Sequence, residues 1–192
     1  YPTKIYLNKI IENSIYCIDS ALVNNHKFKF NGSIEYPERY AFTFNDCSTI
    51  TTFILENDSI KINIDFDNIE NPTINGSKLN NEMNDYIVAS KKIFKKIEYL
   101  FPKFQKARLE NDAEKLNILN TEMMLIEKEH LNFTYNFITN NTTSFVSAML
   151  LRDQLKSTKI DTLQILKSYN LLSNKVKKSP DAEIIAIHLN LH

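Results

Sequence analysis

Apolar and polar side chains alternate over much of residues 27–66. In the clearest stretch, four apolar residues alternate with three polar ones: Ile60, Lys61, Ile62, Asn63, Ile64, Asp65 and Phe66. A period of two is typical of a strand with one buried face. The turn residues at 56–59 predict that this strand folds back onto residues 53–55 as a hairpin.

The same alternation predicts further short strands in this half of the chain. They fall at residues 4–7, 15–18, 27–32, 39–45 and 49–55, separated by turn residues. Short strands with one apolar face need a second layer to pack against. We therefore expect an antiparallel β-sandwich or partial barrel over residues 1–77.

From residue 78 the apolar positions recur every three or four residues, which is typical of helices with one buried face. The first stripe comprises Met83, Tyr86, Ser90, Ile93, Ile97, Leu100 and Phe104, and the second Leu116, Leu119, Met123, Ile126, His130, Phe133 and Phe137. Residues 109–113 supply a break and an N-cap between them. We expect an antiparallel αα-hairpin over about residues 80–139, with a kink or restart at Pro102.

Three shorter helices are predicted after the hairpin. Ser144 caps an almost wholly apolar helix through residue 151, and another helix covers residues 161–169. Ser179 and Pro180 form a cap followed by proline at the first helical position, which begins a last helix over residues 182–191. The predicted fold is α+β: a β domain at residues 1–77 and a helical region at residues 78–192.

Composition excludes several classes of function. The 192 residues are 43% hydrophobic, and 23 Lys and Arg balance 23 Asp and Glu. A chain of zero net charge is disfavoured as a binder of nucleic acid or of a membrane surface. With 2 glycines there is no glycine-rich phosphate loop. No apolar run reaches the roughly 18 residues that span a bilayer. The chain starts at Tyr1, so we expect a processed or trimmed chain whose export signal, if any, was removed.

Two cysteines, Cys17 and Cys47, leave two arrangements open. Their spacing matches neither a zinc site nor a Cys-x-x-Cys redox motif. A disulfide between them would stabilise the fold by about 3–4 kcal/mol. The arrangement that we favour is two separate buried thiols that pack as small apolar residues.

No catalytic, cofactor-binding or metal-binding residues are predicted. Glu127 and His130 form a single Glu-x-x-His motif, whereas a helical di-iron site needs two copies. His130 lies on an apolar stripe, which favours a hydrogen-bonded core or boundary histidine. Ser20 and Ser144 lack the context of a hydrolase nucleophile. Four lysines at positions 91, 92, 95 and 96 favour a solvated helix face, and Asp65, Asp67 and Glu70 a solvated strand end.

Several short blocks resemble a known family. They are Asp19-Ser20-Ala21, His26-Lys27-Phe28-Lys29-Phe30-Asn31-Gly32, Tyr36-Pro37-Glu38-Arg39-Tyr40, Phe53-Ile54-Leu55-Glu56-Asn57-Asp58-Ser59-Ile60 and Ile74-Asn75-Gly76-Ser77. In this order they resemble the domain of unknown function that precedes a thioredoxin-like domain in many Gram-negative envelope proteins. Those proteins belong to the thiol-specific antioxidant and thiol:disulfide interchange group, and many are lipoproteins. The region from Asn140 to Leu151 also resembles the linker before their thioredoxin domain.

The resemblance implies an accessory role in the cell envelope, as a periplasmic protein or outer-membrane lipoprotein. No Cys-x-x-Cys follows the β half, so the redox chemistry of the family would lie after residue 192 or be absent. We expect a non-catalytic N-terminal module that scaffolds a thioredoxin-like domain in cis or binds an envelope protein. It would meet the membrane only through a removed N-terminal lipid anchor. The alternative is a stand-alone envelope module that binds a peptide, glycan or protein.

Overall fold

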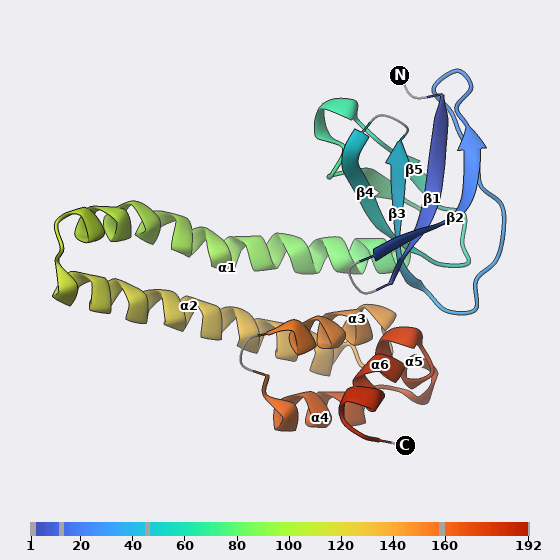
Figure 1. The fold of residues 1–192 in the computed structure, drawn as a ribbon. Helices are drawn as coiled ribbons and strands as arrows, with labels where there is room; N and C mark the ends of the chain where they lie inside the picture. Colours follow the sequence, from blue (N-terminus) through green and yellow to red (C-terminus); the bar gives the residue numbers. More distant parts are fainter. Residues whose placement is uncertain (1–2, 12–13, 45–46, 158–159, 192) are drawn as a thin grey trace. The chain divides into compact units, whose positions relative to one another are not determined.

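The computed structural model describes residues 3–11, 14–44, 47–157 and 160–191, and the side chains of residues 47–49 lie outside this description. The chain divides into two compact units, Tyr1–Asn81 and Glu82–His192. The fold is mixed, with sheets in the first unit and helices in the second (Figure 1).

The first unit contains an open antiparallel sheet of four strands. The strands are β1 (Lys4–Ile11), β2 (Ser14–Leu22), β3 (Glu38–Phe44) and β4 (Cys47–Leu55). Their order is β2-β1-β3-β4, so β2 and β4 are the edges. A second antiparallel sheet pairs β5 (Lys61–Asn63) with β6 (Thr73–Asn75), with a 3-10 turn at Phe66–Asn68 between them. The predicted antiparallel sheet is confirmed, and it is not closed.

Register brings the alternating apolar residues onto one face of the four-stranded sheet. Ile5 lies opposite Phe44, and Leu7 lies opposite Phe42. Because side chains alternate across a strand, these pairs share one face and form a core with Tyr40 and Phe53. Partly buried side chains that pack against this core include Phe28, Phe30, Ile62 and Ile74. The two sheets therefore contribute to one hydrophobic core.

Two strand predictions are wrong. Residues 27–32 form no strand, although the rings of Phe28 and Phe30 pack at 5.2 and 5.6 Å from that of Phe42. The hairpin predicted between residues 53–55 and 60–66 does not form, because β4 pairs with β3 and β5 pairs with β6. Alternation shows which residues face a core, but it does not identify the neighbouring strand.

The second unit is helical, and its first helix begins in the sheet unit. The helices are α1 (Lys78–Leu109), α2 (Ala113–Asn140), α3 (Phe145–Asp153), α4 (Thr162–Leu171), α5 (Asn174–Lys177) and α6 (Pro180–His188), with a 3-10 turn at Gln154–Lys156. The predicted boundary lies between residues 77 and 78, whereas the units divide after Asn81. The short α5 was not predicted.

Helices α1 and α2 pack against each other along their apolar stripes. Leu100 and Ala107 of α1 form a buried cluster with Leu119 and Ile126 of α2. The short connection ends at Asp112, whose carboxylate accepts a hydrogen bond from the N–H of Lys115. α1 continues through Pro102 as one helix, so the predicted restart does not occur. The carbonyl of Glu98 loses its helical donor there, but Glu98 is exposed and water can take the donor's place.

Side-chain caps determine where the shorter helices begin. Ser144 caps α3, and its hydroxyl also donates to the carboxylate of Glu82 on α1. Ser179 caps α6, with Pro180 at the first turn, as predicted. Seven of the nine residues of α3 are buried, which confirms the prediction of a buried helix. Among the described residues, no helix is both long and apolar enough to cross a bilayer.

Candidate functional site

A polar network joins the inner faces of α1 and α2. The Oγ of Ser90 lies 2.8 Å from Nε2 of His130. The Oη of Tyr86 lies 2.8 Å from Oγ1 of Thr134 and 3.5 Å from Nε2 of His130. Thr134 in turn donates to the carbonyl of His130 at 3.0 Å. This confirms the prediction of a hydrogen-bonded boundary histidine.

Aromatic rings surround this network. The ring of His130 lies 4.3 Å from that of Phe94, and the ring of Tyr86 stacks on Phe133 at 5.3 Å. Burial disfavours the charged imidazolium and lowers the pKa of His130 below its usual value. Burial also raises the pKa of Tyr86, and the hydrogen bond with Thr134 partly offsets that rise. Burial therefore favours the neutral form of both side chains.

The Ser90–His130 pair has the spacing of a nucleophile and its general base. Such a base is normally oriented by a third group on its other ring nitrogen. No hydrogen bond to Nδ1 of His130 is found among the described residues. We therefore assign the pair to packing between α1 and α2. Ser90 was not predicted as a candidate nucleophile, unlike Ser20 and Ser144, although it lies on the first predicted stripe.

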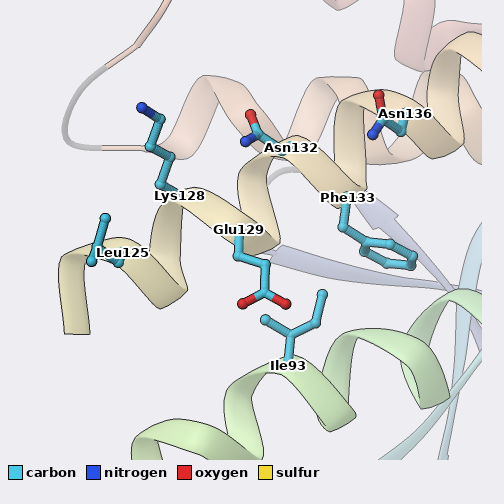
Figure 2. A pocket seen from close by; sticks show the side chains of 7 residues that line it. All are labelled: Ile93, Leu125, Lys128, Glu129, Asn132, Phe133 and Asn136. Carbon is cyan, nitrogen blue, oxygen red and sulfur yellow. The ribbon is translucent and has the colours of Figure 1, made fainter. Parts of the chain in front are cut away.

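A shallow depression of about 480 Å³ lies on the flank of α1 and α2. Its lining residues are Ile93, Leu125, Lys128, Glu129, Asn132, Phe133 and Asn136 (Figure 2). In Figure 2, Glu129 and Phe133 point toward Ile93, whereas Lys128, Asn132 and Asn136 point away from it. Both carboxylate oxygens of Glu129 accept hydrogen bonds from Nζ of Lys96 at 2.6 Å. A binding site for a small molecule requires polar groups that converge on one point, and the polar groups that line this depression do not converge.

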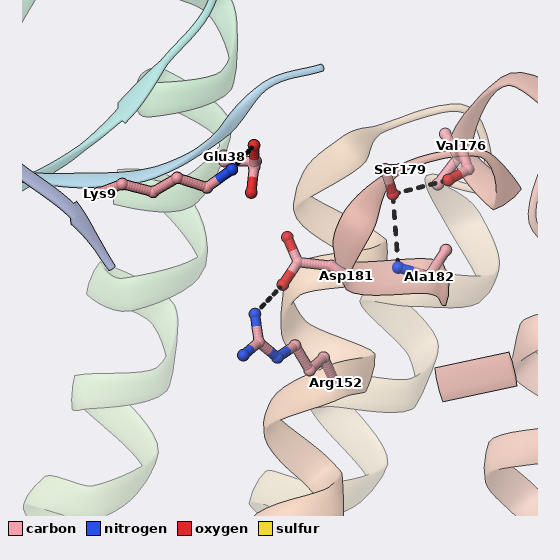
Figure 3. Close-up of polar contacts among 7 residues, drawn as sticks. All are labelled: Lys9, Glu38, Arg152, Val176, Ser179, Asp181 and Ala182. Carbon is pink, nitrogen blue, oxygen red and sulfur yellow. Dashed lines mark hydrogen bonds and ion pairs between the residues drawn. The ribbon is translucent and has the colours of Figure 1, made fainter. Parts of the chain in front are cut away.

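The most buried ion pair described is in the helical unit. Arg152 of α3 donates from Nη1 to Oδ1 of Asp181 at 2.8 Å, and the two side chains are 17% and 6% exposed (Figure 3). The neighbouring Ser179 donates to the carbonyl of Val176 at 2.7 Å and accepts from the N–H of Ala182. This pair joins α3 to the first turn of α6, where a carboxylate is also favoured by the helix dipole.

A second ion pair is described in the sheet unit. Nζ of Lys9 on β1 lies 2.8 Å from Oε1 of Glu38 on β3 (Figure 3). Across the described residues, every buried side-chain nitrogen or oxygen has a hydrogen-bond partner within the chain. The buried polar groups of the described chain are therefore paired with one another or with the backbone.

The two cysteines lie on opposite edges of the four-stranded sheet. Cys17 on β2 carries a free, exposed thiol, so the prediction that it is buried is wrong. Cys47 begins β4, and its side chain lies outside the described residues. A Cys17–Cys47 disulfide, the less favoured of the two arrangements considered, is unfavourable in this sheet, because two strands separate β2 from β4 and strands lie about 4.8 Å apart.

The charged clusters occupy solvated positions. Lys91, Lys92, Lys95 and Lys96 are all exposed on α1, as predicted. Asp65 caps the 3-10 turn by accepting from the N–H of Asp67 at 3.0 Å. Within the described part of the chain, no group of three or more His, Cys, Asp or Glu side chains could hold a metal ion.

Exposed apolar side chains cluster on β2 and α1, which were not predicted to be interaction surfaces. On β2, Ile15, Tyr16, Ile18 and Leu22 are each between 46% and 66% exposed. On α1, Ile87, Phe94 and Phe101 are 40%, 39% and 55% exposed. Exposed apolar groups on an edge strand or a helix flank are typical of surfaces that meet another protein.

The first unit matches one known family model. Residues 2–83 match the family model described as "Domain of unknown function (DUF4369)". The match covers both sheets and the first six residues of α1, and it ends close to the division between the two units. No curated protein and no solved structure matches this chain.

Proposed function

We propose that this chain is a non-catalytic accessory module of a cell-envelope thiol:disulfide interchange protein. It would scaffold a thioredoxin-like domain in cis or bind an envelope protein partner. The observation that carries the proposal is the DUF4369 match over residues 2–83, which coincides with the sheet unit. The motifs in that region resemble the domain that precedes thioredoxin-like domains, which supplies the proposed setting in the periplasm or on a lipoprotein.

The internal polar contacts also favour an accessory role. Among the described residues, the buried polar side chains are paired within the chain, and several of them cap helices or join elements. We further propose that the two sheets act as a β-sandwich and that α1 and α2 act as a long helical hairpin. A hairpin of about 28 residues in each arm would extend roughly 40 Å, which suits a spacer or a lever between domains.

The alternative is a stand-alone envelope module that binds a peptide, glycan or protein. The edge strand β2 favours this alternative, because it pairs only with β1 and leaves apolar side chains in solvent. An extended peptide could add to such an edge by main-chain hydrogen bonds. The reading frame that encodes the chain separates the two proposals: a thioredoxin-like domain after residue 192 favours the first, and a stop codon favours the second.

An insulin-reduction assay tests the shared claim that these residues do no thiol chemistry themselves. With dithiothreitol as reductant, we expect the purified chain to leave the rate of insulin precipitation at that of dithiothreitol alone. Thioredoxin is the positive control. A rate above the background, lost in the Cys17→Ser variant, would overturn the proposal, because the reaction would then use a thiol of this chain.

A further inference from the structure

Helix α1 carries an exposed apolar stripe with a heptad spacing. Ile87, Phe94 and Phe101 lie seven residues apart and are 40%, 39% and 55% exposed. Residues seven apart lie on the same face of a helix, so the three side chains form one line. The stripe borders α2, since the ring of Phe94 lies 4.3 Å from that of His130. We call these three residues the α1 stripe.

Two opposite charges flank the centre of the α1 stripe. Lys91 lies one turn before Phe94, and Glu98 lies one turn after it. At 100° per residue, both lie on the same side of the stripe, about 60° and 40° round from Phe94. Both side chains are exposed, and neither has an ion-pair partner among the described residues. The flank of the stripe is therefore positive at one end and negative at the other.

We propose that two copies of the chain pair antiparallel through their α1 stripes. A two-fold axis at Phe94 sets this residue against its own copy and Ile87 against Phe101 of the second copy. The same axis sets Lys91 against Glu98 of the second copy, and this ion pair forms twice. A parallel two-fold arrangement would place the charged flanks of the two copies on opposite sides of the seam, so Lys91 of one copy could not meet Glu98 of the other.

The charge pattern identifies the occupant as a second copy. An isologous interface must be complementary to itself, so each charge must meet its opposite after the two-fold rotation. Lys91 and Glu98 meet this requirement about Phe94, and the apolar residues at both ends of the stripe do so as well. The inference does not depend on the proposed accessory function, because it concerns only residues of α1 in the helical unit.

Charge reversal tests the pairing directly. Sedimentation equilibrium of the chain from about 1 µM to 1 mM, the span of moderate to weak association, should show a reversible dimer. Each of Lys91→Glu and Glu98→Lys replaces two attractive pairs by two repulsive ones and should weaken the dimer on the order of tenfold. The double variant Lys91→Glu/Glu98→Lys restores opposite charges and should restore the dimer.

Apolar variants test the stripe itself. Phe101→Ser should weaken the dimer, whereas Tyr99→Ser should leave it unchanged, since Tyr99 is 69% exposed but lies about 140° round the helix from Phe94. Circular dichroism confirms that each variant folds. A wild-type chain that stays monomeric over the whole range would overturn the proposal. A dimer that neither Phe101→Ser nor the charge reversals weaken would overturn it as well.

Discussion

The side-chain amide of Asn80 binds both backbone polar groups of Ile54. Oδ1 of Asn80 accepts from the N–H of Ile54 at 2.9 Å, and Nδ2 donates to its carbonyl at 2.6 Å. Asn80 lies in the first turn of α1, and Ile54 lies on the edge strand β4. The amide thus substitutes, at one position, for the strand that β4 lacks on its outer side.

Replacing Asn80 by alanine should therefore destabilise the sheet unit. The change leaves a buried N–H and a buried carbonyl of Ile54 without partners, and each costs about 1–3 kcal/mol. We expect the free energy of unfolding, measured with urea, to fall by about 2–4 kcal/mol. The neighbouring Asn81 is exposed, so Asn81→Ala is the matched control and should change the free energy by less than about 0.5 kcal/mol. Equal effects of the two changes would contradict this role for Asn80.

Protonation of His130 should destabilise the folded chain. Its folded pKa lies below the ordinary value of 6.5, because burial penalises the imidazolium. Below about pH 6.5 the unfolded chain therefore binds more protons than the folded chain. The contribution of His130 to the free energy of unfolding is complete above that pH and is lost as the pH falls through and below it.

Urea unfolding at a series of pH values from about 5 to 8 measures this dependence. His130→Gln should remove a part of the decrease in stability on acidification, whatever it does to stability at pH 7. His188 is exposed, so His188→Gln is the control that replaces a histidine outside the network between α1 and α2. A slope unchanged by His130→Gln would show that other groups cause the acid sensitivity.

The Arg152–Asp181 ion pair should stabilise the packing of α3 against α6. Asp181→Ala leaves the guanidinium of Arg152, 17% exposed, without its carboxylate. Because some solvent reaches Arg152, we expect a loss of about 2–3 kcal/mol, below the 3–5 kcal/mol typical of a fully buried pair. A double-mutant cycle with Arg152→Met measures the coupling between the two residues. Additive effects would mean that the pair contributes nothing as a pair.

The thiol of Cys17 should react rapidly in the folded chain. It is free and exposed on an edge strand. We expect one equivalent of alkylation by iodoacetamide at Cys17 without prior reduction, located by peptide mass mapping. The intact mass should then be the same with and without reductant. A gain of about two mass units on reduction, with no alkylation of Cys17 before reduction, would instead establish a Cys17–Cys47 disulfide.

Local features of this chain were predictable because they depend on neighbouring residues. The caps at Ser144 and Ser179 each involve backbone N–H groups two or three residues away. The buried apolar faces of α1 and α2 follow from helical periodicity alone. Alternation likewise located the apolar face of β3. In each of these cases the residues that form the cap or the repeating pattern lie within a few positions of one another.

The polar network between α1 and α2 could not be identified in this way. Ser90 and His130 are 40 residues apart, and Tyr86 and Thr134 are 48 apart. Their proximity depends on the register that the connection at residues 110–112 imposes on the two helices. Both pairs are centred on that connection, so its position, once known, predicts them.

The sequence by itself determined which faces of most strands and helices are apolar, where the capped helices α3 and α6 begin, and that strands come before helices along the chain. Tertiary structure alone decided that β5 pairs with β6, that residues 27–32 pack without joining a sheet, and that Cys17 is exposed. The physical reason is that periodicity reports whether a side chain meets a core, whereas strand order and helix register depend on contacts between distant segments. The packing of the whole unit determines those contacts.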